Sequence, residues 1–233
     1  MKINSDIQMS IFEEAAISAN APVMCSNFCA VGSVKNYRVS ICDRKKIAGF
    51  VERWHYSKNV NGLTTDYCFL LQDEAGNMIG AMIYGKVAMA DVWRKYADKE
   101  EDLIELKRLC CIDNTPKNTE SFFIGNTLRW LRKNTAIKTV ISYADTTYSH
   151  EGTIYKASNF RHVGMTAKGK VIMYDGKRYH DKTIRTKYNG KLKPFAIKIK
   201  EALETGDAEY VNTLGKHIYL YELRSGSGKN YCT

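Results

Sequence analysis

The 233-residue sequence lacks a long apolar run, and its cysteines do not have the density of a disulfide scaffold. No apolar stretch reaches the roughly 20 residues that a membrane-spanning helix needs, so we expect no membrane-spanning helix. Glu13 and Glu14 interrupt the only apolar stretch near the start, which disfavours a secretory signal. The seven cysteines are an odd number and are typical of reduced thiols. These absences predict a cytoplasmic protein with no membrane partner.

Acidic residues are scarce relative to basic ones, with 25 Asp and Glu against 35 Lys and Arg. The net charge of +10 and the isoelectric point near 9.2 favour a polyanionic partner, either nucleic acid or a membrane surface. The excess is concentrated between Lys168 and Lys200, where eleven basic residues accompany only Asp175 and Asp181. The aromatic residues interleaved with them are Tyr174, Tyr179, Tyr188 and Phe195.

This basic segment is predicted to bind nucleic acid, because basic side chains neutralise phosphates and aromatic rings stack on exposed bases. A solvated basic loop has a similar composition, and that alternative stays open. Three glycines and Pro194 interrupt any long amphipathic helix, so a membrane surface is disfavoured. The residues expected to contact nucleic acid are Lys177, Arg178, Lys182, Arg185, Lys187, Lys191 and Lys193.

The chain is expected to form one mixed α/β domain that carries an insertion. Residues 1–36 lack strong periodicity and are interpreted as a loosely attached leader, residues 37–224 as the domain, and residues 225–233 as a flexible tail. Residues 166–215 are the basic insertion, which precedes the last strand. The patterns follow the order β-α-β-β-β-α-β-α-β, then the insertion, then β. This order predicts a mixed central sheet flanked by helices.

Alternating or apolar runs predict strands, and apolar residues at helical spacing predict helices. Asp43 is expected to cap the first helix, whose apolar residues include Ile47 and Val51. The expected strands cover residues 37–42, 67–72, 78–85, 103–112, 138–144, 161–166 and 216–223. The expected helices cover 44–54, the second part of 113–134, a short segment after 151, and 194–204.

Polar loops follow two of these strands, and both are expected at one site. The loops are "CCIDNTPKNTES", residues 110–121, and "ADTTYSHE", residues 144–151. In mixed α/β sheets, ligands bind where the carboxyl ends of strands open a crevice. Asp145, directly after an apolar strand, is a candidate base or ligand there, although Asp often forms an Asx turn in such a place.

The order of elements resembles the GNAT acyltransferases, which bind acetyl-CoA between two central strands. The segment "GTIYKASNFRHVG", residues 152–164, is similar to their fourth-helix region. More narrowly, "RWHYSK", "LKRLCCIDNTPKNTESFFIG" and "YADTTYSHEGTIYKASNFRHVG", together with the basic segment, resemble the Mom DNA-modification proteins of Mu-like bacteriophages. That resemblance implies a GNAT-like fold, double-stranded DNA as partner, and conversion of adenine to N6-(carbamoylmethyl)adenine in the bacterial host's cytoplasm. The mark shields the phage genome from host restriction.

The resemblance also implies roles for individual residues. Tyr155 would protonate the departing CoA thiolate, as a GNAT tyrosine commonly does, and a packing tyrosine is the alternative. The candidate catalytic residues are Asp145, Tyr155, Ser121, His55 and Tyr56. The residues expected to hold acetyl-CoA or a related acyl donor are Arg108, Lys117, Thr119, Ser121, Gly125 and Asn126. One feature departs from the GNAT pattern, because the phosphate-binding loop has no glycine before Gly125.

The product implied by the resemblance raises a chemical difficulty. Plain acetyl transfer attaches a carbonyl carbon to N6, whereas a carbamoylmethyl group attaches a methylene carbon. A redox metal would help to rearrange the acetyl unit, and His55, Tyr56 and Asp145 form a ligand set compatible with iron. A zinc site at Cys110 and Cys111 is disfavoured, because adjacent residues of a strand point to opposite faces. Cys25 and Cys29 are the other candidates for zinc.

Two other functions remain open from the sequence. A conventional acetyltransferase acting on a protein or a small amine would share the fold, but it leaves the basic insertion without a role. A non-catalytic DNA-binding protein would use the insertion, but it leaves the polar loops without one. A homodimer is compatible with either.

Overall fold

The structure is a computed structural model that describes residues 33–148 and 150–224. The expected tail, Ser149 and all but the last residues of the expected leader lie outside the described residues, as do Cys25 and Cys29. The central elements are β1 (Arg38–Cys42), α2 (Arg44–Trp54), β2 (Tyr67–Gln72), β3 (Met78–Gly85), β4 (Leu103–Cys111), α3 (Thr119–Asn134), β5 (Thr139–Asp145), α4 (Thr153–Ala157), β6 (Arg161–Met165) and β10 (Lys216–Glu222). Short 3-10 helices are η1 (Val34–Asn36), η2 (Val92–Lys95), η3 (Glu100–Asp102) and η4 (Thr146–Tyr148). No helix within the described ranges is long and apolar enough to span a bilayer.

The predicted order of strands and helices is confirmed, and α2 has the predicted bounds. Its apolar stripe places Ile47 and Val51 fully inside the protein, because residues four apart share one face of a helix. Asp43 precedes the helix as expected, although its side chain makes no capping hydrogen bond. Asp43 therefore marks the start of the helix, but the predicted capping hydrogen bond is not formed.

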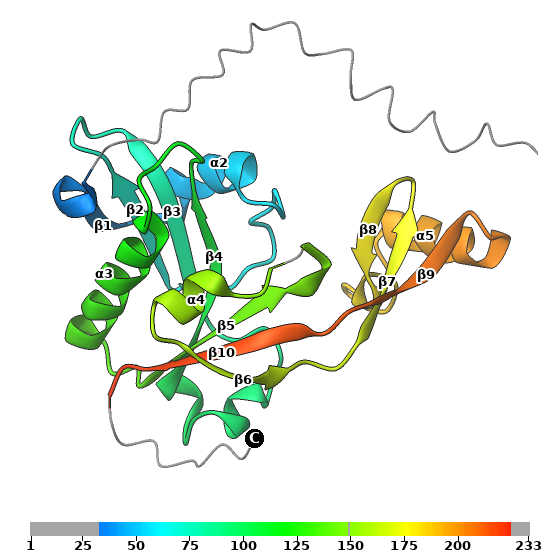
Figure 1. Cartoon of the computed structure of the whole chain (residues 1–233). Coiled ribbons are helices and arrows are strands. Elements are labelled where there is room, and N and C mark those ends of the chain that lie inside the picture. Colours follow the sequence, from blue (N-terminus) through cyan, green and yellow to red (C-terminus); the bar gives the residue numbers. More distant parts are fainter. Residues whose placement is uncertain (1–32, 149, 225–233) are drawn as a thin grey trace, which may run out of the picture. The chain divides into compact units, whose positions relative to one another are not determined.

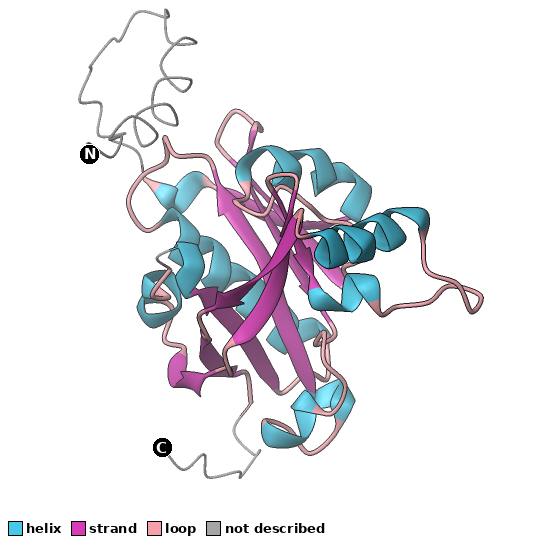
Figure 2. Cartoon of the chain, turned by 90° about the vertical axis from the view of Figure 1, so that its right-hand side faces the viewer, coloured by secondary structure: helices cyan, strands magenta, loops and turns pink. Residues whose placement is uncertain are grey.

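The central sheet has seven strands in the order β1-β2-β3-β4-β5-β10-β6. All neighbouring strands run antiparallel except β4 and β5, which are parallel. Helices lie on both sides of the sheet (Figure 2). The mixed α/β class, the flanking helices and the insertion before the last strand are as predicted.

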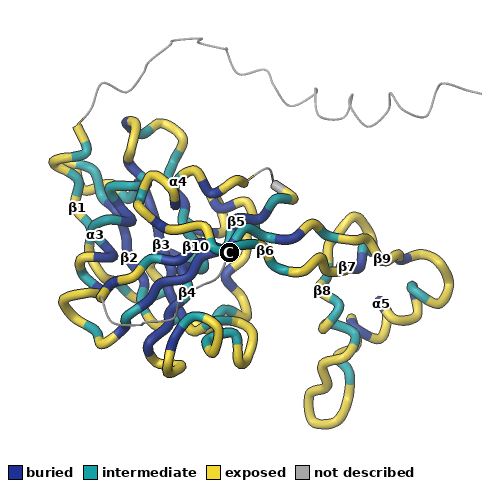
Figure 3. The backbone as a smooth tube through the Cα atoms, turned by 60° about the horizontal axis from the view of Figure 1, so that its bottom comes forward, coloured by how far each residue is buried: buried dark blue, intermediate teal, exposed yellow. Residues whose placement is uncertain are grey.

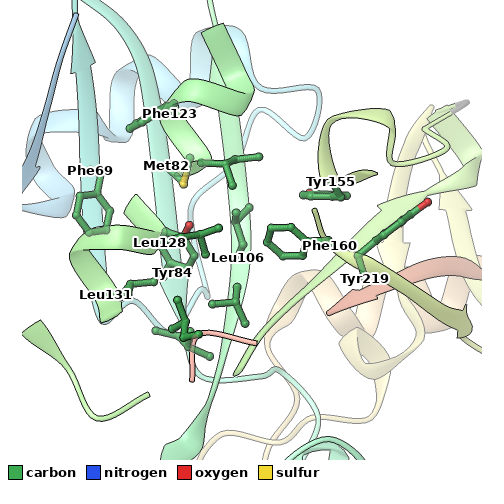
Figure 4. Packing of buried hydrophobic residues seen from close by; sticks show 14 of the residues in the cluster. Phe69, Met82, Tyr84, Leu106, Phe123, Leu128, Leu131, Tyr155, Phe160 and Tyr219 are labelled. Atoms are coloured by element: carbon green, nitrogen blue, oxygen red, sulfur yellow. The ribbon is translucent and has the colours of Figure 1, made fainter. Parts of the chain in front are cut away.

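The two faces of the sheet bury separate apolar clusters. On the face of α3 and α4, Phe69, Met82 and Phe123 pack with Tyr155 and neighbouring rings (Figure 4). On the face of α2, Ile47, Val51 and other apolar side chains pack with Cys68, Ala81, Ile83 and Cys110. Cys110 belongs to the α2 cluster, while Cys111 packs against the α3 cluster. The prediction that these neighbours point to opposite faces is confirmed.

The insertion contains strands that the sequence analysis did not predict. Its elements are β7 (Gly169–Tyr174), β8 (Lys177–His180), η5 (Asp181–Ile184), α5 (Pro194–Thr205) and β9 (Ala208–Thr213). The three strands form a second sheet in the order β8-β7-β9 (Figure 1). Ile172, Ile199, Ala202 and Ala208 form a small core between this sheet and α5. Most residues of the insertion outside this core are exposed (Figure 3).

A turn explains why this second sheet forms. Asp175 and Gly176 join β7 to β8 with positive φ angles of 49° and 64°, as a two-residue hairpin turn of the primed type requires. An Asp-Gly pair between apolar or alternating residues is a strong hairpin signal. The Asp175-Gly176 pair, and not the charge of the segment, is therefore the sequence signal for this hairpin.

We expect Gly152→Ala to destabilise the protein by about 1–3 kcal/mol. Gly152 has a φ of 70°, and a Cβ atom there would lie 2.5 Å from Cζ of the Tyr219 ring. Gly49→Ala in α2 is the matched control, since its Cβ would meet no atom within 4 Å. The control should be neutral or stabilising by up to about 1 kcal/mol. Urea unfolding of both variants measures the difference, and equal stabilities would contradict the close approach.

Candidate active site

A cavity forms where the two parallel strands separate. β4 and β5 pair only from Leu103 opposite Thr139 to Leu106 opposite Ser142, although β4 continues to Cys111 and β5 to Asp145. β4 has a bulge at Lys107, because Leu106 and Arg108 face consecutive residues of β3. Bulges bend a strand and are common beside active sites. The separated strand ends line a cavity of about 320 Å³, hereafter the cleft.

The structure brings four of the five predicted catalytic residues together in the cleft. His55 and Tyr56 line it from the loop after α2, Asp145 from the end of β5, and Tyr155 from α4. Ser121 lines a neighbouring cavity of about 490 Å³, which is formed by α3, α4 and residues near the end of β10. The expected convergence of the two polar loops is therefore present, with Ser121 beside the cleft instead of in it.

Both faces of the sheet contribute to the cleft. Successive side chains of β5 alternate, so Ser142 and Ala144 face α3 and α4 while Tyr143 and Asp145 face the other side. Tyr155 reaches the cleft from the α4 side, and His55 reaches it from the α2 side. Two molecules could thus approach the gap from opposite faces.

Tyr155 is a buried phenol beside the point where β4 and β5 separate. It is 8% exposed and packs against the rings of Phe160 and Tyr219, with centroid distances of 5.5 and 5.3 Å (Figure 4). Burial raises the pKa of Tyr155 to about 12, although its hydrogen bond with Ser142 acts in the opposite direction. Ser142 itself donates to the carbonyl oxygen of Leu106, across the last paired position of β4 and β5. The phenol is therefore neutral at pH 7 and lies beside the point where the strands part.

Asp145 is an ionised and well-partnered carboxylate. Its Oδ2 lies 3.0 Å from Nζ of Lys216, and its Oδ1 accepts a hydrogen bond from the backbone N–H of Thr147. Burial raises the pKa of Asp145, but the hydrogen bonds and charge of Lys216 and Thr147 outweigh burial and lower it overall. The contact with Thr147 is the Asx turn that the sequence analysis gave as the alternative. A catalytic role for Asp145 stays a prediction.

His55 is held as a neutral imidazole. Burial, together with the charges of Arg108 and His150, lowers the pKa of His55 to about 4. The backbone N–H of Ser57 donates to Nδ1 of His55, so the proton of the neutral ring is assigned to Nε2. The rings of His55, Tyr56 and His150 lie in a row, with centroid distances of 4.2 and 5.1 Å. They form an aromatic wall on the α2 side of the cleft.

The loop before α3, which the resemblance implies binds phosphate, turns sharply although it has no glycine before Gly125. Asn118, directly before α3, has a φ of 71°, a conformation that asparagine tolerates better than most residues. The loop can therefore turn sharply into α3 without glycine. The N–H group of Thr119 already donates to the carbonyl oxygen of Pro116, whereas the next N–H groups of α3 have no partner within the helix and can bind an anion.

The predicted donor-binding residues are only partly brought together. Ser121 and Gly125 line the 490 Å³ cavity, whereas Asn126 lines a different one. The buried hydroxyl of Thr119 donates to the carbonyl oxygen of Pro116, and Lys117 is exposed. These contacts leave Ser121 and Gly125 as the positions that fit the prediction best.

Arg108 lies away from α3. Its guanidinium donates to the carbonyl oxygens of Asn59 and Lys107. The bulge at Lys107 shifts the alternation of β4, so Arg108 shares the α2 face with Cys110, while Leu106 and Leu109 share the α3 face. This position gives no support to donor binding by Arg108.

The predicted metal ligands fit a metal ion poorly. Among the residues that the structure describes, no group of three or more His, Cys, Asp or Glu side chains could hold one. His55, Tyr56 and Asp145 line the same cleft, but both carboxylate oxygens of Asp145 are already engaged. A cation beside the Lys216 ammonium would also be repelled. The iron site stays a prediction, and metal analysis of the purified protein tests it.

The predicted nucleic-acid residues all lie in the insertion. All of them are exposed, namely Lys177, Arg178, Lys182, Arg185, Lys187, Lys191 and Lys193. Arg185 pairs with Asp181 on η5. Binding of nucleic acid to this surface stays a prediction.

Residues 36–232 match the Mom protein family. The chain belongs to that family. A curated relative is "Methylcarbamoylase mom" of Escherichia phage Mu, which is 26% identical over 137 residues. The match covers 58% of this chain and 56% of that protein, so the chain spans little more than half of the relative's length.

Solved structures of similar fold are N-acetyltransferases. A spermidine N-acetyltransferase mutant of Vibrio cholerae has a TM-score of 0.48 and 8% identity, covering 81% of this chain and 94% of that one. A ribosomal-protein-S5-alanine acetyltransferase of Vibrio fischeri has a TM-score of 0.46 and 9% identity, covering 83% and 97%. A GNAT family N-acetyltransferase of Escherichia coli, in complex with CoA, has a TM-score of 0.41 and 12% identity, covering 54% and 68%. These similarities concern the fold alone.

Sequence reasoning missed two lysines of the cleft region in this Mom family member. Lys107 lines the cleft from the bulge, its side chain is 4% exposed, and its ammonium donates to Oγ1 of Thr64. Lys216 is the partner of Asp145. The consecutive polar residues Lys107 and Arg108 interrupt an alternating strand and could have indicated the bulge. No local signal connects Lys216 with Asp145.

We expect the low pKa of His55 to destabilise the protein in acid. An unfolded chain binds a proton at His55 below about pH 6.5, whereas the folded chain resists it until about pH 4. Stability should therefore fall as the pH drops through this window, by up to about 3 kcal/mol from this residue. Urea unfolding at several pH values should show a shallower loss for His55→Gln. His180→Gln, at an exposed position, is the control, and a parallel loss in all three proteins would contradict a neutral, buried His55.

Proposed function

We propose that this protein modifies adenine in double-stranded DNA to N6-(carbamoylmethyl)adenine with an acyl-CoA-type donor, and thereby protects phage DNA from host restriction. The observation that carries the proposal is a cleft lined from both faces of the sheet in a member of the Mom family. The neutral phenol of Tyr155 lies in this cleft, where β4 and β5 separate. The name of the phage Mu relative supports a carbamoyl-containing product.

The acceptor side follows from the chemistry of adenine. The exocyclic N6 is a weak nucleophile, and in a duplex it is paired, so the base must be extruded to react. Extruded bases are commonly held by stacking on aromatic side chains. The wall of His55, Tyr56 and His150 gives the α2 side of the cleft such a surface. Trp54, which is 39% exposed on α2, does not line the cleft.

The donor side follows from α3 and α4. The N–H groups that follow Thr119 at the start of α3 suit a phosphate, and Arg129 lines the adjoining 490 Å³ cavity. Arg132 also lines this cavity, but its guanidinium already donates to Leu223 and Tyr221. A pantetheine arm entering the cleft from this side would bring its sulfur toward Tyr155. With an acetyl-CoA-type donor, the product balances when N6 loses a proton and bonds to the methyl carbon, which requires a two-electron oxidant as co-reactant. Ammonia, or another source of amide nitrogen, then displaces CoA from the carbonyl carbon, and the departing thiolate takes the phenolic proton of Tyr155. Lys216 keeps Asp145 ionised, so Asp145 is better placed to orient Thr147 and the strand end than to accept a proton.

Replacing Tyr155 tests its proposed role as the general acid. We expect Tyr155→Phe to lower adenine modification about 100-fold or more, because a general acid contributes at least that much. The test is nucleoside mass spectrometry and restriction digestion of DNA from bacteria that express the full chain. Tyr174→Phe, in the small core of the insertion, is the matched control and should retain modification.

The product distinguishes the proposed reaction from its alternatives. A carbamoylmethyl group carries one more nitrogen and one more hydrogen than an acetyl group, so the two adenine products differ in mass. Acetylated adenine would favour conventional acyl transfer. Unmodified DNA from cells with abundant folded wild-type protein would defeat the proposal, and DNA binding without modification would favour a non-catalytic protein.

The donor site has its own test. We expect Arg129→Gln to weaken CoA binding by about five- to tenfold, since one charge-assisted contact to a phosphate is lost. Isothermal titration of the purified protein with CoA measures the dissociation constant. Lys99→Gln, at an exposed position outside this cavity, is the control. Equal affinities of the two variants would remove Arg129 from the donor site.

A further inference from the structure

The insertion carries a short hairpin whose backbone is fixed. Tyr188 and Lys191 exchange two backbone hydrogen bonds of 2.7 and 3.0 Å. Asn189 and Gly190 between them have positive φ angles of 50° and 76°, as a two-residue primed turn requires. The tip is thus a defined turn that presents its flanking side chains in fixed directions.

Tyr188 presents an aromatic ring at this tip. The residue is 59% exposed, and Nζ of Lys193 lies 4.1 Å from the ring centroid. This cation–π contact occupies one face of the ring, so the exposed area comes from the opposite face and the edge. Phe195, which is 49% exposed, lines the same 210 Å³ hollow as Tyr188 and Lys193. A solvent-exposed ring face beside positive charges can stack on a flat group of an anionic ligand.

The charge around the hairpin has one sign. From Lys182 to Lys200 there are seven Lys or Arg residues and no Asp or Glu. Lys187 and Lys191 flank the tip, and both are exposed. Positive charge alone would suit any polyanion. The exposed ring of Tyr188 favours, among polyanionic ligands, one with flat groups that can stack on it, which is nucleic acid.

We propose that Tyr188 is a stacking platform for an unpaired base of DNA, with the neighbouring phosphates held by Lys187, Lys191 and Lys193. A paired duplex offers base edges in its grooves but keeps base faces stacked, so the ring needs a locally opened site. This inference rests on the proposed function for its choice of DNA. It adds the element that contacts bases and the requirement that the duplex be open.

Fluorescence anisotropy with the full chain, without any acyl donor, tests the proposal. The two probes are a labelled duplex with one bulged, unpaired adenine and the same duplex fully paired. The wild type should bind the bulged duplex more tightly. Tyr188→Leu should lose about tenfold in affinity for the bulged duplex and little for the paired one, because stacking is lost. Tyr188→Phe keeps the ring and should bind as the wild type does.

The lysines should behave differently from the ring. Lys191→Gln should weaken binding to both duplexes and lower the salt dependence by about one phosphate contact. Tyr210→Leu is the matched control, because Tyr210 is 48% exposed in the same insertion but lies on β9. Circular dichroism confirms that each variant is folded.

Three outcomes would overturn the inference. They are equal losses for Tyr188→Leu and Tyr210→Leu, equal losses on both duplexes, and tighter binding of an acidic peptide than of either DNA. Failure of the proposed function looks different. Tyr188-dependent binding to the bulged duplex would then persist while DNA from expressing cells contains no modified adenine.

Discussion

The separation of β4 from β5 after Leu106 and Ser142 is the constraint on which the rest of the site depends. Two neighbouring parallel strands normally continue their hydrogen bonds to the sheet edge, and buried backbone groups without partners are costly. Here the bulge at Lys107 bends β4, and Ser142 uses its hydroxyl to bond the carbonyl oxygen of Leu106 where the strands part. Beyond this point, residues of α4 and of the loop after α2 line the opening between the strands from the two faces of the sheet. This opening is the cleft.

The same opening gives the two sides of the cleft different electrostatic character. Tyr155 is surrounded by rings and aliphatic chains, so burial keeps its proton on the oxygen at neutral pH. Asp145, three residues beyond Ser142 on the opposite face, meets Lys216 and stays charged. His55 is buried near the cation of Arg108 and stays neutral. One face of the cleft therefore carries a neutral phenol, and the other carries a fixed ion pair and a neutral imidazole.

The sequence predicted the central elements well, because their periodicity and apolar runs are strong. It predicted the convergence of two strand ends by the same reasoning, and His55, Tyr56, Asp145 and Tyr155 do meet. Arg108 lies elsewhere because a bulge reverses the alternation, and a bulge depends on the pairing of β4 with β3. Lys216 was missed because its partner is 71 positions away in the chain and the contact arises from the register of β10 with β5.

That register also ties the insertion to the cleft. β9 ends at Thr213, and only Leu214 and Gly215 precede Lys216, the residue of β10 opposite Asp145. A Cβ atom on Gly215 would lie 2.4 Å from the carbonyl oxygen of Thr166, so only glycine fits this junction. Thr166 and Lys216 also exchange hydrogen bonds, one through the backbone and one through the Thr166 hydroxyl. The chain thus leaves and re-enters the central sheet through one tightly packed point, and that point sets the position of the ammonium that keeps Asp145 ionised.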